Sequence, residues 1–232
     1  MALVKYGGGI IQASGSIAGT THARNRFGNY IRARTKPVNP NSLQQGHVRT
    51  SLSFLTMAWA SVLTPAERIA WATYANAIAM KNRLGESIYL TGFNHFIRSN
   101  VEYYRHKLLY VKAGPTTLAL PEKDVAFACT GSVAAQRISV AFTEGAAWAI
   151  EIGAQMFVYM GTPRQITRNF FNGPWKCAGT ITGVANPGVQ SPTDLVAPMT
   201  LILGQLVTCY ARIWRIDGRI SEPFTSTFTV TA

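Results

Sequence analysis

The sequence predicts an α+β protein in three parts: an extended basic arm over residues 1–40, a helical domain over 41–114, and an antiparallel β domain over 115–232. Hydrophobic residues recur with a period of about 3.6 before Gly114-Pro115 and of about 2 after it, which separates helices from strands. Charge divides the chain at the same place. Residues 1–114 hold 14 Lys and Arg against 3 Asp and Glu, whereas residues 115–232 hold 8 against 7.

The N-terminal half therefore carries +11 of the formal net charge of +12, and the first carboxylate of the chain is Glu67. Such an asymmetry predicts a polyanion or an acidic protein as the partner of that half. With 232 residues, 47% hydrophobic and 14% charged, the chain resembles ordinary globular proteins and is long enough to bury a core. We expect no membrane-spanning segment and no signal peptide. The three widely spaced cysteines predict buried thiols in a reducing cytoplasm, with one Cys–Cys bridge as the alternative.

In the arm, Gly28-Asn29 predicts a two-residue hairpin turn that pairs Phe27 with Tyr30. Basic side chains then lie on both faces of the hairpin. Neither face can form a core, so we expect the arm to dock on another surface. Pro37–Pro40 predicts a hinge between the arm and the rest of the chain.

Three amphipathic helices that pack on one another are predicted in the helical domain. Asn41 or Ser42 caps the first helix; Thr64, followed by Pro65 and Glu67, caps the second; and Thr91 caps the third. Their apolar stripes at helical spacing are Val48, Leu52, Leu55, Trp59 and Val62 for the first; Trp71, Tyr74, Ala75 and Ile78 for the second; and Phe93, Phe96, Ile97, Val101, Tyr104 and Leu108 for the third.

The β domain is predicted from runs of β-branched and aromatic residues bounded by Gly, Pro and Asn. These runs are Gln136–Thr143, Ala154–Met160, Trp175–Thr182, Val207–Trp214 and Ser226–Thr231. The stretch Gly204–Ser221 resembles the last hairpin of a fibronectin type III or related immunoglobulin-like sandwich, with Tyr210 as the corner tyrosine and Asp217-Gly218 as the turn. That resemblance implies an antiparallel immunoglobulin-like β-sandwich, a fold that commonly serves binding.

The first candidate contact site is the basic cluster of the arm: Arg24, Arg26, Tyr30, Arg32, Arg34 and Lys36. Its guanidinium groups could bind carboxylates and carbonyls of a neighbouring subunit. They could also bind phosphates of a nucleic acid, with aromatic residues stacking on bases; a merely solvated arm is the third alternative. Arginine outnumbers lysine four to one in the cluster, which favours fixed contacts with a protein.

The second candidate is a loop that holds two adjacent phenylalanines, which cannot both face inward on a strand. One of them is predicted to be exposed or to insert into a partner, and the alternative is a loop that folds back over its own sandwich. The possible interface residues are Phe170, Phe171 and Trp175, in the stretch that begins at Asn169.

Catalytic signatures are missing from the sequence: it contains no HExxH, GxSxG, Walker A or GxGxxG motif. All four histidines lie in the N-terminal half and all three cysteines in the C-terminal half. We therefore expect a protein that is not an enzyme and has no cofactor, no metal site and no small-molecule substrate.

The ordered string from Ser14 to Gln44, with Ala58-Trp59 and Ala66-Glu67-Arg68 followed by Ala70-Trp71, resembles a family of uncharacterised proteins from bacteriophage and prophage gene clusters. The resemblance spans roughly the first 100 residues and brings no catalytic residue with it. It implies a virion component made in the host bacterial cytoplasm: a capsid-decorating, head–tail connecting or tail-associated subunit that contacts other subunits and itself. A nucleic-acid-binding protein is the main alternative, and a carbohydrate- or host-binding module the third.

Overall fold

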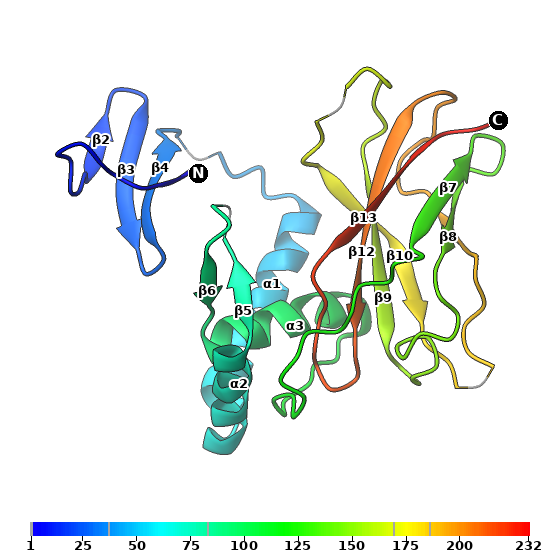
Figure 1. Cartoon of the computed structure of the whole chain (residues 1–232), viewed down its shortest axis with the longest axis horizontal. Coiled ribbons are helices and arrows are strands. Elements are labelled where there is room, and N and C mark those ends of the chain that lie inside the picture. Colours follow the sequence, from blue (N-terminus) through cyan, green and yellow to red (C-terminus); the bar gives the residue numbers. More distant parts are fainter. Residues whose placement is uncertain (1, 37, 83, 169, 186) are drawn as a thin grey trace.

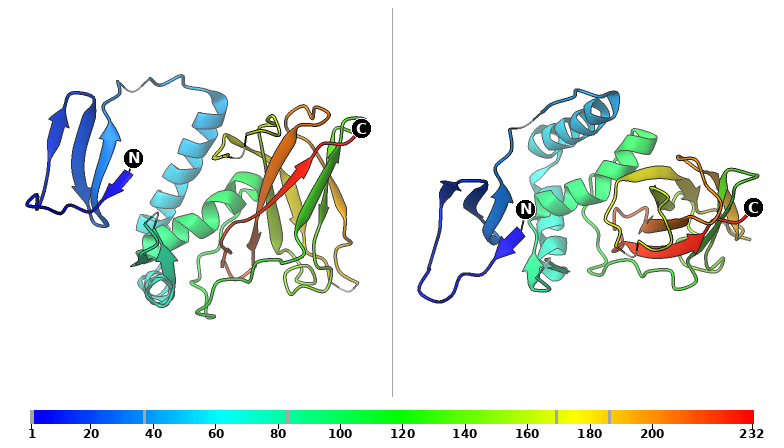
Figure 2. Two further views of the ribbon diagram at one scale, coloured as in Figure 1. Left: turned by 45° about the horizontal axis from the view of Figure 1, so that its top comes forward. Right: turned by 90° about the horizontal axis from the view of Figure 1, so that it is seen from above.

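The computed structural model describes residues 2–36, 38–82, 84–168, 170–185 and 187–232. Within these ranges the chain forms three α-helices, a short π-helix and four antiparallel sheets, which confirms a mixed α+β protein. A small sheet lies at one end, the helices lie in the middle, and two larger sheets lie at the other end (Figures 1 and 2).

The N-terminal sheet consists of β1 (Ala2–Val4), β2 (Gly15–Ile17), β3 (Thr20–Asn25) and β4 (Gly28–Ala33), in the order β1-β4-β3-β2. The prediction of an extended basic arm is thus not confirmed, because these segments pair with one another in a small sheet. No residue of the described range 2–36 is buried, as expected for a segment without a core face. Pro37 of the predicted hinge lies outside the described residues.

The predicted hairpin is present as β3–β4, but its turn lies two residues earlier than expected, at Arg26-Phe27, so that Asn25 pairs with Gly28. Asn25 explains the shift: its Oδ1 accepts a hydrogen bond from the Phe27 backbone N–H at 2.9 Å, the local turn that Asn favours. Gly28 then supplies the positive φ, +121°, with which the chain enters β4. A shift of two residues leaves every side chain on its predicted face.

The helical part comprises α1 (Leu43–Met57), the π-helix η1 (Ala58–Val62), α2 (Pro65–Ala77) and α3 (Gly92–Lys107). The predicted caps are confirmed at Ser42, Thr64 and Thr91, each of which accepts a backbone N–H with its side chain. A hairpin of β5 (Ala79–Lys81) and β6 (Ser87–Tyr89), which was not predicted, joins α2 to α3.

The apolar stripe predicted for the first helix was only partly right. Leu55 is fully buried, but Val48, Leu52 and Val62 are 41%, 45% and 42% exposed. The covered strip of α1 is the neighbouring one, where Phe54 stacks on Tyr104 of α3 at 4.6 Å. Periodicity indicates that a helix has an apolar face but not which part of that face another helix covers. On the third helix, Leu108 is 73% exposed rather than packed.

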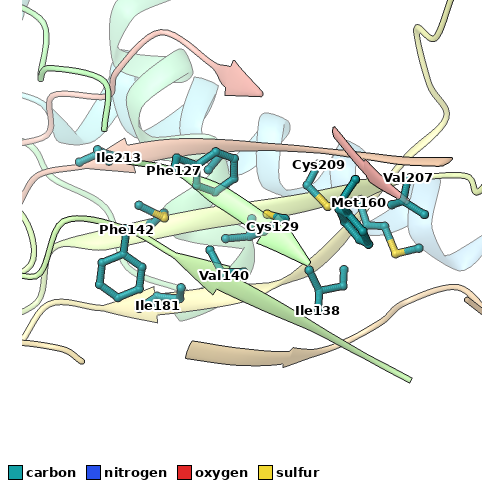
Figure 3. Close-up of a cluster of buried hydrophobic side chains, with 14 of the residues drawn as sticks. Phe127, Cys129, Ile138, Val140, Phe142, Met160, Ile181, Val207, Cys209 and Ile213 are labelled. Carbon is teal, nitrogen blue, oxygen red and sulfur yellow. The ribbon is translucent and has the colours of Figure 1, made fainter. Parts of the chain in front are cut away.

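Seven strands form the two larger sheets. β11 (Thr193–Val196), β8 (Arg137–Ala141) and β7 (Ala128–Ser132) make one sheet, and β10 (Trp175–Thr182), β9 (Gln155–Gly161), β12 (Leu206–Trp214) and β13 (Phe224–Thr229) make the other, each in the order given. All five predicted strands have counterparts here; β7 and β11 were not predicted. The sheets share one core, in which residues such as Ile138, Met160 and Val207 are fully buried (Figure 3). Cys129 and Cys209 are buried thiols of this core, and Cys177 is a half-buried thiol.

The outer face of the four-stranded sheet packs against α3. Every residue of β9 is buried, because Phe157 and Tyr159 pack outward in a second cluster with Trp214 and Tyr103. Tyr103 of α3 stacks on Trp214 of β12 with ring centroids 3.9 Å apart. Helices and larger sheets therefore share an interface across the predicted boundary at residues 114–115.

Tyr210 does not occupy the place predicted for it. It lies in the middle of β12 and stacks on Tyr159 at 4.7 Å, whereas a corner tyrosine stands near the start of its strand. The Asp217-Gly218 turn is confirmed, with Gly218 at φ +89°.

Candidate interaction surfaces

The N-terminal sheet displays its cations on both faces. Arg24 pairs with Asn29 on one face, and Arg32 pairs with Thr21 on the other. All five cations predicted as contacts are exposed. Their backbones belong to the sheet or its continuation, but none of their side chains forms a hydrogen bond or ion pair with a residue of the described ranges: Arg24, Arg26, Arg32, Arg34 and Lys36. These charges thus have no partner within the described part of the chain.

Tyr30, predicted beside these arginines, is only half-buried. It pairs with Ala23 of β3 and with Leu3 of β1, so it contributes to the sheet as well as to its surface. The sheet contacts the rest of the chain through an ion pair between Lys5 and Glu86.

The two phenylalanines of the aromatic loop (residues 170–175) separate as predicted. Phe170 is 76% exposed, whereas Phe171 packs edge-to-face on Trp175 at 4.8 Å. Trp175 in turn packs edge-to-face on Tyr210. Phe171 and Trp175 thus pack on their own sheet, as the second alternative predicted, whereas Phe170 is exposed. Contact of Phe170 with a partner stays a prediction. Asn169 lies outside the described residues. The loop and the N-terminal sheet are well separated (Figure 1), so the two predicted sites do not form one surface.

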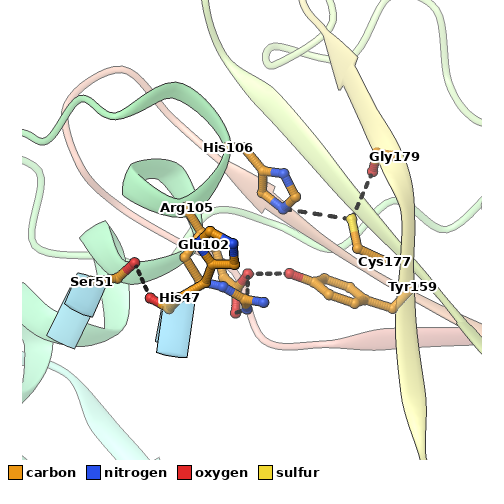
Figure 4. Close-up of polar contacts among 8 residues, drawn as sticks. All are labelled: His47, Ser51, Glu102, Arg105, His106, Tyr159, Cys177 and Gly179. Carbon is orange, nitrogen blue, oxygen red and sulfur yellow. Dashed lines mark hydrogen bonds and ion pairs between the residues drawn. The ribbon is translucent and has the colours of Figure 1, made fainter. Parts of the chain in front are cut away.

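A third group of polar side chains, which the sequence did not reveal, lies between α3 and the four-stranded sheet (Figure 4). Glu102 accepts a hydrogen bond from the Tyr159 hydroxyl and pairs with Arg105 at 3.2 Å. One turn further along α3, His106 Nε2 lies 3.5 Å from the Cys177 Sγ. Helix and sheet are thus joined by polar contacts at one end of their shared interface.

The His106–Cys177 pair has the residue types of a cysteine nucleophile and its base, but its electrostatics do not activate the thiol. Burial raises the pKa of Cys177 and lowers the pKa of His106, so both groups are held neutral. A reactive cysteine needs a thiolate, which a lowered pKa would supply. Burial thus favours the neutral thiol and imidazole, and the pair forms a polar contact between α3 and β10.

Arg98 anchors the other end of this interface. Its two terminal nitrogens donate to the backbone carbonyls of Ile220 at 2.9 Å and Ser221 at 3.0 Å, and Glu222 lies 3.7 Å away. Burial lowers the pKa of Arg98 to about 10, so the guanidinium stays charged at neutral pH. The arginine ties α3 to the segment that leads into β13.

Comparison with models of known protein families finds no match to this chain, and comparison with curated proteins finds none either. The resemblance to phage proteins accordingly remains a prediction. None of the helices in the described ranges is long and apolar enough to cross a bilayer.

Proposed function

We propose that this protein is a structural subunit of a bacteriophage particle, with no catalytic role, that attaches to neighbouring subunits through its basic N-terminal sheet. It is made in the host bacterial cytoplasm and resides in the virion as a capsid-decorating, head–tail connecting or tail-associated component. Other virion subunits and further copies of the chain are its partners.

One observation carries the proposal: the N-terminal sheet has four short strands and no buried residue in its described part. A small sheet needs a packed face for stability, and the ion pair that joins this segment to the helical part, Lys5–Glu86, is exposed. Its unpaired arginines present forked donors that suit carboxylates and backbone carbonyls. A surface on another subunit would supply both a packing face and these acceptors.

The larger sheets support a second element of the proposal, an immunoglobulin-like sandwich of the fibronectin type III kind. Three strands, β11-β8-β7, share a core with four, β10-β9-β12-β13, and β9 and β12 occupy the centre of the four-stranded sheet. Seven antiparallel strands in two sheets around one core are typical of such sandwiches. Binding by loops and edges is their usual role, although the fold alone does not fix a function.

The test replaces arginine, whose guanidinium donates two parallel hydrogen bonds, with lysine, whose ammonium group carries the same charge at a single point. Arg32→Lys with Arg34→Lys keeps the charge but removes the bidentate geometry, so we expect the double variant to be depleted from purified particles while remaining folded. Lys36→Arg is the matched control. Normal incorporation of the double Lys variant would refute attachment through protein contacts of these arginines.

Nucleic-acid binding is the second candidate, favoured by one observation: the described range 2–36 holds cations and no carboxylate. If the sheet bound phosphates, DNA affinity would fall with salt at a log–log slope of about −0.9 per phosphate contacted. The double Lys variant would then bind DNA almost as well as the original chain, because counterion release responds to charge. Retained DNA binding together with normal incorporation into particles would favour this candidate.

A further inference from the structure

A hollow with a volume of about 350 Å³ opens between the end of β9 and the start of β10. Its walls include Thr162, Arg164, Arg168, Phe170, Phe171 and Asn172, and we call it the Arg164 pocket. The volume falls within the range of small-ligand sites. Two guanidinium groups and two aromatic rings line it, without a carboxylate among the lining residues.

Arg164 is the unusual member of this pocket, because it is only 9% exposed and yet pairs with no carboxylate in the described part of the chain. The five residues outside the described ranges include no Asp or Glu, so none of them could supply a carboxylate to Arg164. The side chain donates from Nε to the Arg168 carbonyl at 2.9 Å and from Nη1 to Thr208 Oγ1 at 2.8 Å. Among the described residues these bonds use two of the five N–H donors of Arg164, which leaves three donors of a buried charge without a partner there.

The surrounding contacts hold this guanidinium in place. The Arg164 backbone exchanges two hydrogen bonds with Leu206, at 3.0 and 2.8 Å. The Phe171 ring centroid lies 4.9 Å from the Arg164 Cζ, and Trp175 packs edge-to-face against that ring. A donor fixed at both ends loses little conformational freedom when a ligand binds.

We propose that the Arg164 pocket binds a carboxylate presented by an acidic segment of a partner protein, with an apolar side chain of that segment resting on Phe170. A carboxylate accepts two parallel bonds from a guanidinium, and it would neutralise the buried charge. Phe170, 76% exposed at the rim, offers the aromatic contact area that protein interfaces favour. This site does not depend on the role of the N-terminal sheet.

A peptide carboxylate fits better than a nucleic acid. Non-specific binding of single strands uses a continuous basic groove along the backbone, whereas this half of the chain has a net charge of only +1, from 8 basic and 7 acidic residues. An isolated pair of arginines flanked by an exposed phenylalanine suits one acidic side chain and its apolar neighbour.

The test uses the full chain labelled with ¹⁵N and two capped dipeptides, N-acetyl-Asp-Phe-amide and its neutral counterpart N-acetyl-Asn-Phe-amide. We expect the Arg164 Nε–H signal and the Phe170 and Asn172 amide signals to shift with the Asp peptide at up to about 10 mM, a range suited to weak ligands. The Asn peptide should leave the Arg164 signal in place. Arg164→Lys should weaken binding about tenfold or more, because a point charge cannot replace the fork.

Lys176→Gln, at an exposed cation of β10, is the matched control and should not change the affinity. Should an Arg164 variant fail to fold, Arg168→Gln replaces an exposed residue of the same pocket and should weaken binding of the Asp peptide. The proposal is overturned by equal shifts from both peptides, by no shift at all, by an equal response to inorganic phosphate, or by tighter binding of a single-stranded oligonucleotide at the same signals.

Discussion

Replacing Gly218 with alanine would test how firmly the larger sheets rest on the helices. Gly218 stands in the turn after β12 at φ +89°, and an added Cβ would lie 3.3 Å from Cη2 and 3.4 Å from Cζ2 of Trp71. Trp71 has little room to move, since it is fully buried and its Nε1 donates to the Lys112 carbonyl at 2.8 Å. The methyl group would therefore press a turn of the C-terminal part against α2.

Two separate effects of Gly218→Ala lower the free energy of unfolding, and their magnitudes add. A positive φ costs a residue other than glycine roughly 1–2 kcal/mol, and one extra carbon in a well-packed interface costs about 1–3 kcal/mol. Gly204 separates them, because its φ is +73° but nothing lies within 4 Å of an added Cβ. We expect Gly204→Ala to lower the free energy of unfolding by roughly 1–2 kcal/mol and Gly218→Ala to lower it by about 2–5 kcal/mol.

Urea titration followed by far-ultraviolet circular dichroism measures both variants. Trp71→Phe removes the crowded edge of the indole, so a double-mutant cycle with Gly218→Ala should show a favourable coupling of about 1 kcal/mol. Equal losses for the two alanine variants, with no coupling to Trp71→Phe, would show that the turn does not press on α2.

Three further predictions concern the helices and the N-terminal sheet. Burial lowers the pKa of His95 to about 4; the unfolded chain therefore takes up the proton first, and stability present above pH 6.5 should fall as the pH drops towards 4. His95→Leu should remove that part of the pH dependence of the urea midpoint. Trp71→Ala should cost about 3–5 kcal/mol by the same titration, and Trp59→Ala less, since Trp59 is only half-buried. A chain of residues 41–232 should keep its urea midpoint but be missing from purified particles, and its normal incorporation would exclude the N-terminal sheet as the attachment site.

Features set by neighbouring residues could be read from the sequence. The capping box of α2 is the clearest case, because Thr64 and Glu67 satisfy each other's backbone N–H groups within four residues. The sequence also predicted that one of two adjacent phenylalanines would be exposed, because adjacent side chains of a strand point to opposite faces; Phe170 is exposed, although the structure places both residues in a loop before β10. The basic cluster could be found because the first 66 residues contain no Asp or Glu, which is visible in the sequence without knowledge of the fold.

Features set by residues distant in the chain could not be predicted. The Glu102–Tyr159 hydrogen bond joins residues 57 positions apart, and Arg164 meets Thr208 across 44 positions. Neither pair produces a periodic pattern or a motif of fixed spacing in the sequence. The strip of α1 that α3 covers was missed for the same reason, because Val48 and Leu52 have the spacing of a core face but remain 41% and 45% exposed.

The double burial of β9 also determines which substitutions the chain can tolerate. A strand with one solvent-exposed face accepts polar residues at every second position. Substitutions at those positions are tolerated without loss of the fold. Along β9 neither set of alternate positions has that freedom, because Met156 and Val158 face the core of the sheets while Phe157 and Tyr159 face the α3 interface. In a saturation library, this strand should appear as an unbroken block of seven restricted positions, whereas β8 should alternate between restricted and permissive ones.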